Sequence, residues 1–260
     1  MHPTLSLLKR AHAVTRKLSP HANKRIIIAC FPKSASTFLR NVIGEITGYT
    51  TNEFCVAYER NEQDLYLPTL IDHAFTPVVN HMHMQARGNN VAIMQTSGIR
   101  PTVLVRNIFD TTVSMANHLA NHSPFFSMAY VDDSFAQLPP EEQLDMVIDL
   151  CMPWFISFYV SWYKVRQDNL LDTYWLTYEK LTDDKPAAVA DICRFYGIET
   201  DRATIDKAIA TIEGNKKKSN LNVGVKGRGK AQLTDVQKQK IIKMASYYKD
   251  VDFSLIGITG

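Results

Sequence analysis

The sequence predicts an α/β protein in which a parallel β-sheet is flanked by α-helices, and three observations carry that prediction. Residues 25–30 form a β-branched run, which is typical of a strand buried on both faces of a parallel sheet. The run stops at a hydroxyl-rich turn, residues 31–37, and residues 38–46 then carry apolar side chains at helical spacing. Further along the chain, strand patterns alternate with helical patterns, as they do in proteins with parallel sheets.

The other expected elements follow in chain order. Strand patterns occur at residues 77–83, 101–105 and 174–177. Helical patterns occur at residues 109–119, 141–166, 186–195, 203–212 and 234–248. We expect the helix at 141–166 to be kinked or split at Pro153, because a proline removes a backbone hydrogen bond from a helix interior.

The length and charge of the chain bound its class. With 260 residues, it suits one sizeable α/β domain. We assign residues 25–260 to that domain and the basic, amphipathic residues 1–24 to an N-terminal helical extension. A net charge of +3 is too small to indicate a nucleic-acid partner by itself.

Two further features predict a cytoplasmic protein. No apolar stretch approaches the roughly 18 residues of a membrane span, so we expect no integral membrane segment. The four cysteines are widely scattered, with neither C-x-x-C pairs nor metal-ligand spacing, which favours free thiols in a reducing compartment. They are Cys30, Cys55, Cys151 and Cys193.

The turn after the first strand predicts a phosphate site. Lys33 and the hydroxyls of Ser34, Ser36 and Thr37 precede a helix whose free N–H groups and positive dipole end favour an anion. An ordinary nucleoside-triphosphate loop reads G-x-x-x-x-G-K-[ST]. Here Ile27 and Pro32 stand at its glycine positions, so the turn is P-loop-related in topology without being an ATP or GTP loop. A plain helix N-cap at Ser34 or Ser36 is the alternative.

A second phosphate site is predicted at the end of the strand at 101–105. Arg106 ends that strand, where a guanidinium is costly unless it meets an anion. Ser114 lies about two helical turns into the following helix. A structural pair between Arg106 and Asp110 is the alternative for this motif taken alone.

Together these motifs resemble the sulfotransferases that use PAPS (3′-phosphoadenosine 5′-phosphosulfate). The family pattern P-K-[ST]-G-T-T-[WF]-L matches residues 32–39, and R-N-P-x-D-x-x-x-S matches Arg106, Asn107, Asp110 and Ser114. A Y-E-x-L element appears at residues 178–181, and a glycine-rich basic loop at residues 224–230. The four occur in family order and span most of residues 25–235, so the resemblance implies a P-loop-related parallel sheet of the sulfotransferase fold.

The resemblance implies PAPS as cofactor, 3′,5′-ADP as its product, and no metal. Ala35 departs from the family's usual glycine, and Phe38 replaces the commoner tryptophan that stacks on adenine. Arg228 is our choice for the 3′-phosphate among the basic residues of the last loop, with Lys226 and Lys230 as alternatives. The implied cofactor-binding residues are Lys33, Ser34, Ala35, Ser36, Thr37, Phe38, Arg106, Ser114, Tyr178, Gly227, Arg228 and Gly229.

The resemblance also implies the catalytic residues, Lys33, His83 and Ser114. The family takes its general base from the end of the strand after the acceptor-binding segment, where this chain reads His81-Met82-His83. Residues i and i+2 of a strand point to the same side, so His81 is the alternative base. A third reading gives neither histidine a catalytic part, and a metal site is not expected because no third ligand has suitable spacing.

The sequence leaves the acceptor and the oligomeric state open. By position in the family, residues 50–76 line the acceptor pocket, including Tyr58, Glu59, Arg60, Asp64 and Tyr66. The family's dimerisation motif is only half present, at Lys230 and Thr234. We expect His118 and His122 to mark a solvated helix end, followed by an irregular stretch that suits an acceptor lid.

We therefore predict an enzyme that transfers a sulfuryl group from PAPS to a hydroxyl or amine by in-line displacement. Lys33 is expected to stabilise the leaving phosphate and His83 to act as general base. Two other functions compete with this prediction: a non-catalytic protein that binds 3′,5′-ADP or PAPS, and an atypical P-loop kinase.

Overall fold

A computed structural model describes residues 24–56, 63–122, 129–215 and 227–259, together with residues 6, 7, 9, 10 and 13 near the N-terminus. Within these ranges, four parallel strands form one sheet in the order β2-β1-β3-β4. They are β1 (Arg25–Cys30), β2 (Val78–Met82), β3 (Thr102–Val105) and β4 (Tyr174–Thr177). Because every pairing is parallel, the carboxyl ends of all four strands lie at the same edge.

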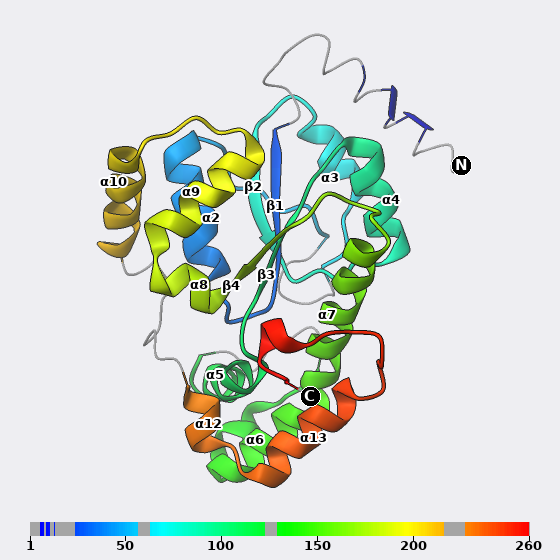
Figure 1. Ribbon diagram of the computed structural model, residues 1–260, viewed down its shortest axis with the longest axis vertical. Coiled ribbons are helices and arrows are strands. Elements are labelled where there is room, and N and C mark those ends of the chain that lie inside the picture. Colours follow the sequence, from blue (N-terminus) through cyan, green and yellow to red (C-terminus); the bar gives the residue numbers. More distant parts are fainter. Residues whose placement is uncertain are drawn as a thin grey trace.

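Helices cover both faces of the sheet (Figure 1). One face carries α2 (Ser36–Thr47), α9 (Lys185–Tyr196) and α10 (Arg202–Glu213), which pack on one another through an apolar cluster. The other face carries α7 (Met152–Gln167), with α3 (Leu67–Asp72) and α4 (Gly88–Ser97) beside it (Figure 1). Side chains of β1 alternate between the two apolar clusters, so Ile26 and Ile28 face α2 while Ile27 and Ala29 face α7.

A third group of helices gathers beyond the carboxyl edge of the sheet (Figure 1). It contains α5 (Ile108–Asn121), α6 (Pro140–Leu150), α12 (Arg228–Gln232) and α13 (Asp235–Ala245), with short 3₁₀ turns at Asp133–Gln137 and Ser254–Ile256. Of these, α5 packs against both α6 and α12. This group therefore lies on the side of the sheet where the four strands end (Figure 1).

The elements agree with the sequence prediction in kind and differ in detail. All four expected strands form, and the long apolar helix is split at Cys151, so that Pro153 lies in the first turn of α7, where its missing N–H costs nothing. The Y-E-x-L element at residues 178–181 forms the start of helix α8 (Tyr178–Asp183), and Thr177 caps the N–H of Lys180. Helices α3 and α4 escaped the sequence prediction. Helix α4 buries the polar residues Asn90 and Ser97 together with its apolar residues. Its sequence therefore shows no continuous apolar face at helical spacing.

Two other expectations need comment. The run Pro140–Gln167, which contains α6 and α7, has 28 residues and includes an 18-residue window with a mean hydropathy of 1.4, so it is long and apolar enough to cross a membrane by length and composition only. This corrects the expectation that no stretch approaches that length. Its most apolar window is 56% buried inside the domain, and Phe155, Tyr159 and Trp162 are fully buried, which explains the composition by packing.

All four cysteines are free and buried, as predicted. Apart from isolated residues, the helical extension assigned to residues 1–24 lies outside the described part.

Candidate active site

The four strands deliver the predicted residues to one place. Lys33 lies in the turn after β1, His83 follows β2, Arg106 follows β3 and Tyr178 follows β4. Arg106 Nη1 donates a hydrogen bond of 2.8 Å to the Lys33 carbonyl, and its guanidinium carbon lies 4.1 Å from the centre of the Tyr178 ring. Parallel topology thus brings together residues that are up to 145 positions apart (178 − 33).

The turn after β1 has the backbone of an anion site. Lys33 and Ala35 both adopt left-handed conformations, with φ of 67° and 66°. Ser34 turns its hydroxyl inward to the Phe31 carbonyl at 2.6 Å, and Ala35 is the N-terminal cap of α2, with no side-chain cap in the described structure. The plain N-cap at Ser34 or Ser36 is therefore ruled out. The helix N-terminus keeps its free N–H groups for a ligand.

Arg106 is the most strongly buried cation of the site. Arg106 is 5% exposed, and its Nε has no hydrogen-bond partner among the described residues. Burial lowers the pKa of Arg106, while nearby Tyr178, Asp110 and Glu179 raise it and nearby Arg228 lowers it. A buried guanidinium with an unused donor and a second guanidinium near it calls for an anion.

Asp110 explains how the C-terminal basic loop reaches this anion site. Its two carboxylate oxygens each accept a 2.8 Å hydrogen bond, from the backbone N–H groups of Gly227 and Gly229. A Cβ at Gly229 would lie 2.3 Å from the carbonyl carbon of Phe109, so only glycine permits this contact. Asp110 thereby anchors the start of α12, and half-buried Arg228 is its first residue. Lys226 and the rest of the loop before Gly227 lie outside the described part.

The remaining cofactor candidates are placed differently. Ser36 is buried, while Thr37 and Ser114 are half-buried, Thr37 in the first turn of α2 and Ser114 on α5. Phe38 is fully buried in the apolar cluster under α2, and Tyr178, 3% exposed, stacks on Arg106. Stacking of Phe38 on adenine and a part for Tyr178 in cofactor binding therefore stay predictions.

The ring of His83 is held by a contact between its Nδ1 and a backbone carbonyl. Its Nδ1 lies 3.0 Å from the Cys30 carbonyl, which can only accept, so the proton sits on Nδ1 and Nε2 is the accepting nitrogen of the neutral ring. Its backbone N–H donates to Gln63 Oε1 at 2.5 Å. Burial lowers the pKa of His83 to about 4, with Lys33 adding to the effect, so the ring is neutral at pH 7.

His81 differs from His83 in burial. It is 4% exposed inside β2, whereas His83 is half-buried just beyond the strand end. The two ring centres are 5.9 Å apart. Burial also holds the pKa of His81 well below its usual range. The contrast favours His83 as the histidine that a substrate can reach.

His118 corrects the expectation of a solvated helix end. Its Nδ1 lies 3.5 Å from Lys33 Nζ, and the residue is half-buried, whereas His122 is exposed. Burial lowers the pKa of His118 to about 4, helped by Lys33, His122 and His83. Its position four residues after Ser114 on the same helix was the sequence signal for it, since i and i+4 share a face.

Gln63 is the other functional candidate that the sequence did not single out. Its side chain is 2% exposed, and it reaches the loop after β2 from the predicted acceptor segment. In the same segment, Asp64 accepts a 2.8 Å hydrogen bond from Asn90, and Tyr66 is 43% exposed. Tyr58, Glu59 and Arg60 lie outside the described part.

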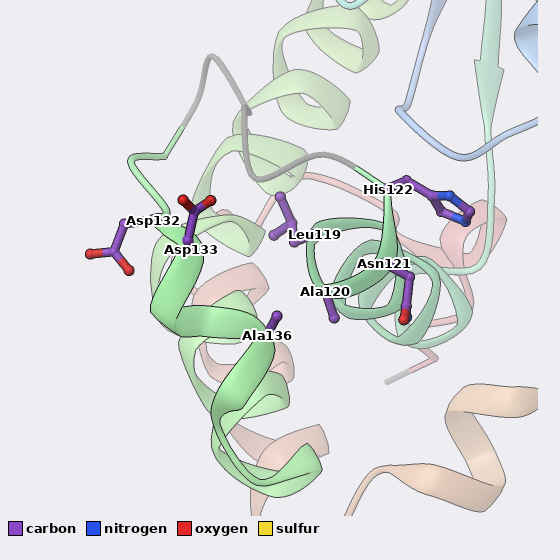
Figure 2. A pocket seen from close by; sticks show the side chains of 7 residues that line it. All are labelled: Leu119, Ala120, Asn121, His122, Asp132, Asp133 and Ala136. Atoms are coloured by element: carbon purple, nitrogen blue, oxygen red, sulfur yellow. The ribbon is translucent and has the colours of Figure 1, made fainter.

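A hollow of about 240 Å³ lies beside the site, between the end of α5 and the 3₁₀ turn at Asp133–Gln137 (Figure 2). Leu119, Ala120 and Ala136 form its inner wall, while the ring of His122 points away from them (Figure 2). Asp132, on its rim, already accepts hydrogen bonds from the Ser134 N–H and hydroxyl. Within the described residues, no group of three or more His, Cys, Asp or Glu side chains could hold a metal ion.

These features define an α/β protein with a parallel sheet, whose basic residues gather at the carboxyl edge of the strands. The family model described as a sulfotransferase domain matches residues 23–243, so the chain belongs to the sulfotransferase family, whose chemistry is sulfuryl transfer. This confirms the family and the enzyme class that the motifs indicated.

Solved structures agree with this fold. Mouse sulfotransferase SULT7A1 complexed with PAP has a TM-score of 0.67, with 17% sequence identity, and the match covers 91% of this chain and 89% of that one. Retinol dehydratase in a complex with retinol and PAP has a TM-score of 0.59, with 13% identity, and the match covers 89% of this chain and 83% of that one. At these identities the likeness shows the fold, which confirms the predicted sulfotransferase fold. A comparison with curated proteins finds no match.

Proposed function

We propose that this chain transfers the sulfuryl group of PAPS to a hydroxyl or amine of an acceptor. The observation that carries the proposal is the meeting of Lys33, His83 and Arg106 at one edge of the sheet, each directly beyond a strand end. Two neighbours in fold were solved with PAP, the 3′,5′-ADP that such a reaction releases, which supports the choice of nucleotide.

The residues fit a nucleotide phosphorylated at both ends. The turn at residues 32–37 and the N-terminus of α2 would hold the 5′ group through backbone N–H donors and Lys33. Arg106, with its unused Nε, would hold the 3′-phosphate together with Ser114 and Arg228. Gly227 and Gly229 use their N–H groups on Asp110, so their part in this site would be to position Arg228.

Lys33 would act on the leaving group. Bound PAPS would supply the sulfuryl group, and its 5′-phosphate would be the leaving group. Lys33 is half-buried, and its pKa is lowered by burial first and by Arg106 second. The positive charge of its ammonium is therefore poorly neutralised by its surroundings in the free protein. An ammonium in this state gains most from negative charge that develops beside it, and it therefore stabilises the transition state more than the ground state.

His83 would take the acceptor's proton. The contact of Nδ1 with the Cys30 carbonyl fixes the tautomer in which Nε2 is the accepting nitrogen. As the acceptor oxygen forms its bond to sulfur and the sulfur–bridging-oxygen bond breaks, the hydroxyl proton passes to His83 and 3′,5′-ADP leaves. The low pKa of His83 in the free protein keeps the base unprotonated near pH 7, and the negative charge of a bound nucleotide would raise this pKa toward neutrality.

The acceptor and the cellular setting are part of the proposal. The charged and aromatic residues of the 50–76 segment suit a polar or glycan-like acceptor better than a steroid-like one. Four free cysteines fit a cytoplasmic location, because such thiols persist in reducing compartments.

Nucleotide-dependent thermal stability tests the binding half of the proposal. Saturating 3′,5′-ADP, at 100 times its Kd, adds about 2.7 kcal/mol, or roughly 5–10 °C in melting temperature for a chain of this size. ADP and ATP lack the 3′-phosphate for Arg106, so they should protect much less, with or without Mg²⁺. Equal protection by ADP would overturn the proposal, and Mg²⁺-dependent protection by ATP would favour the kinase alternative.

Turnover tests the catalytic half. With labelled PAPS and a panel of hydroxyl and amine acceptors, Lys33→Ala should lower kcat about 10²–10³-fold, because it removes stabilisation specific to the transition state. Lys238→Ala, a lysine paired with Asp235 on α13, is the matched control and should leave kcat unchanged. Nucleotide binding without transfer to any acceptor would favour the non-catalytic alternative.

A further inference from the structure

Lys33 and His118 form a contact that the proposed reaction does not by itself require. The Nζ of Lys33 lies 3.5 Å from the Nδ1 of His118, across 85 residues of chain. Ser114 and His118 lie four residues apart on α5, so the helix face that carries one also carries the other. The same face of α5 therefore serves both the predicted 3′-phosphate site and the lysine of the turn after β1.

The surroundings of Lys33 make this contact important. The ammonium is held among cations, with Arg106 near enough to lower its pKa, and no carboxylate forms a salt bridge with it among the described residues. A half-buried ammonium needs an acceptor to replace the water that it has lost. His118 is the side chain that supplies one in the described structure.

An imidazole suits this task better than a carboxylate would. Nδ1 of His118 can accept from an ammonium only when the ring is neutral and its proton is on Nε2. Burial, Lys33, His122 and His83 all favour that neutral form. A neutral acceptor fixes the position of Lys33 without cancelling its charge, whereas a carboxylate would form an ion pair with it.

The two imidazoles near Lys33 are therefore in opposite tautomers. His83 donates through Nδ1 to the Cys30 carbonyl, whereas His118 accepts through Nδ1. An ammonium has three N–H donors, so one bond to His118 leaves two for a ligand. The contact is compatible with Lys33 acting on a leaving phosphate at the same time.

We propose that His118 is a positioning residue for Lys33, whose ammonium it holds as a neutral hydrogen-bond acceptor in place for the leaving group. The proposal rests on the proposed function, since it assigns His118 a part in that reaction. His118 remains distinct from the general base, because its accepting nitrogen is occupied by Lys33.

Two substitutions at His118 separate the effect of its hydrogen-bond acceptor from the effect of its size. His118→Asn places a carbonyl oxygen near the position of Nδ1 and so keeps a neutral acceptor. His118→Leu keeps a side chain of similar size but removes the acceptor. His118→Leu should lower kcat about 10- to 100-fold, the size of effect expected when a catalytic group is slightly misplaced. His118→Asn should restore most of kcat. Asn117→Leu, next to His118 on α5 and exposed, is the matched control and should behave like the unmodified protein.

A double-mutant cycle with Lys33→Ala shows whether His118 acts through Lys33. If it does, adding His118→Leu to Lys33→Ala should cause no further loss of kcat. Melting temperatures and the Kd for 3′,5′-ADP, measured on each variant, identify any loss caused by unfolding or weaker nucleotide binding.

The outcomes are distinguishable from failure of the proposed function. Absence of sulfuryl transfer by the unmodified protein would refute the function itself. If the unmodified protein is active, the positioning role is overturned by any of three results: full kcat in His118→Leu, an equal loss in His118→Asn, or an additive loss in the double variant. Rescue by asparagine together with non-additivity supports it.

Discussion

The nucleotide side of the cleft is built from the ends of regular elements, whereas the acceptor side, where it is described, is built from short segments between them. On the nucleotide side, Lys33, Arg106 and Tyr178 each follow a strand, and Arg228 begins a helix. On the acceptor side, residues 63–66 and the 3₁₀ turn at Asp133–Gln137 approach His83 and α5 from connecting segments. The neighbouring ranges 57–62 and 123–128 lie outside the described residues.

This difference reflects what each side recognises. A phosphate presents the same oxygens in every family member, so the same elements can bind it: a strand end, a helix N-terminus and an arginine guanidinium. Such a constant arrangement is visible in the sequence as a motif. An acceptor has no such fixed geometry, and connecting segments adapt to it without a constant pattern. The predictions below test whether the two sides are separable.

The largest effect should come from His83. His83→Ala should lower kcat for hydroxyl acceptors about 10²–10⁴-fold, the usual contribution of a general base, while leaving the Kd for 3′,5′-ADP unchanged. Transfer kinetics and nucleotide titration on the same preparation measure both. Asn117→Ala, an exposed side chain on α5, is the control and should keep full activity. Weakened nucleotide binding in His83→Ala would show that the two sides are not separable, and full activity would move the role to His81.

The converse effect is expected at Arg106. Arg106→Ala should raise the Kd for 3′,5′-ADP at least about 30-fold, because it removes a buried guanidinium from a charged ligand. Arg100→Ala, which removes an exposed ion pair with Asp172, is the control and should bind normally. Calorimetric titration measures both. A drop in kcat at saturating PAPS with unchanged affinity would contradict the assignment of Arg106 to binding.

A smaller effect is expected from pH. The pKa values of His83 and His118 lie at about 4 in the folded protein, below the ordinary value of 6.5. Between these values the unfolded chain takes up protons that the folded chain refuses, so stability is complete above pH 6.5 and is lost as pH falls toward 4. The melting temperature should fall over this range by at least about 2–4 °C, the equivalent of 1 kcal/mol. His118→Asn should fall less, and a flat profile in the unmodified protein would contradict the buried, neutral imidazoles.

The smallest effect concerns Ala35. Its left-handed backbone, with φ of 66°, costs a non-glycine residue roughly 1–2 kcal/mol. Ala35→Gly relieves this strain but gives flexibility to the unfolded chain, about 0.4–1 kcal/mol, so the net gain should be a few tenths to about 1 kcal/mol. Ala203→Gly, at an exposed helical position of α10, is the control and should destabilise. Denaturant unfolding measures both, and a loss of stability in Ala35→Gly would mean that the turn is not strained there.

The sequence by itself determined the β-branched strand, the turn with Lys33, the arginine that ends a buried strand, and the family order of the motifs. These depend on side-chain period and turn chemistry over a few neighbouring residues, which a sequence displays directly. It also ranked His83 above His81 as general base, an order that stays a prediction.

Only the tertiary structure decided which distant groups meet. It placed His118 on Lys33, Gln63 on the backbone of His83, and Asp110 on the N–H groups of Gly227 and Gly229, which are 117 and 119 residues further along the chain. These contacts depend on the order of the parallel strands and on which face each helix presents to the sheet edge. Such long-range pairing is set by packing of the whole core, and no local pattern in the sequence records it.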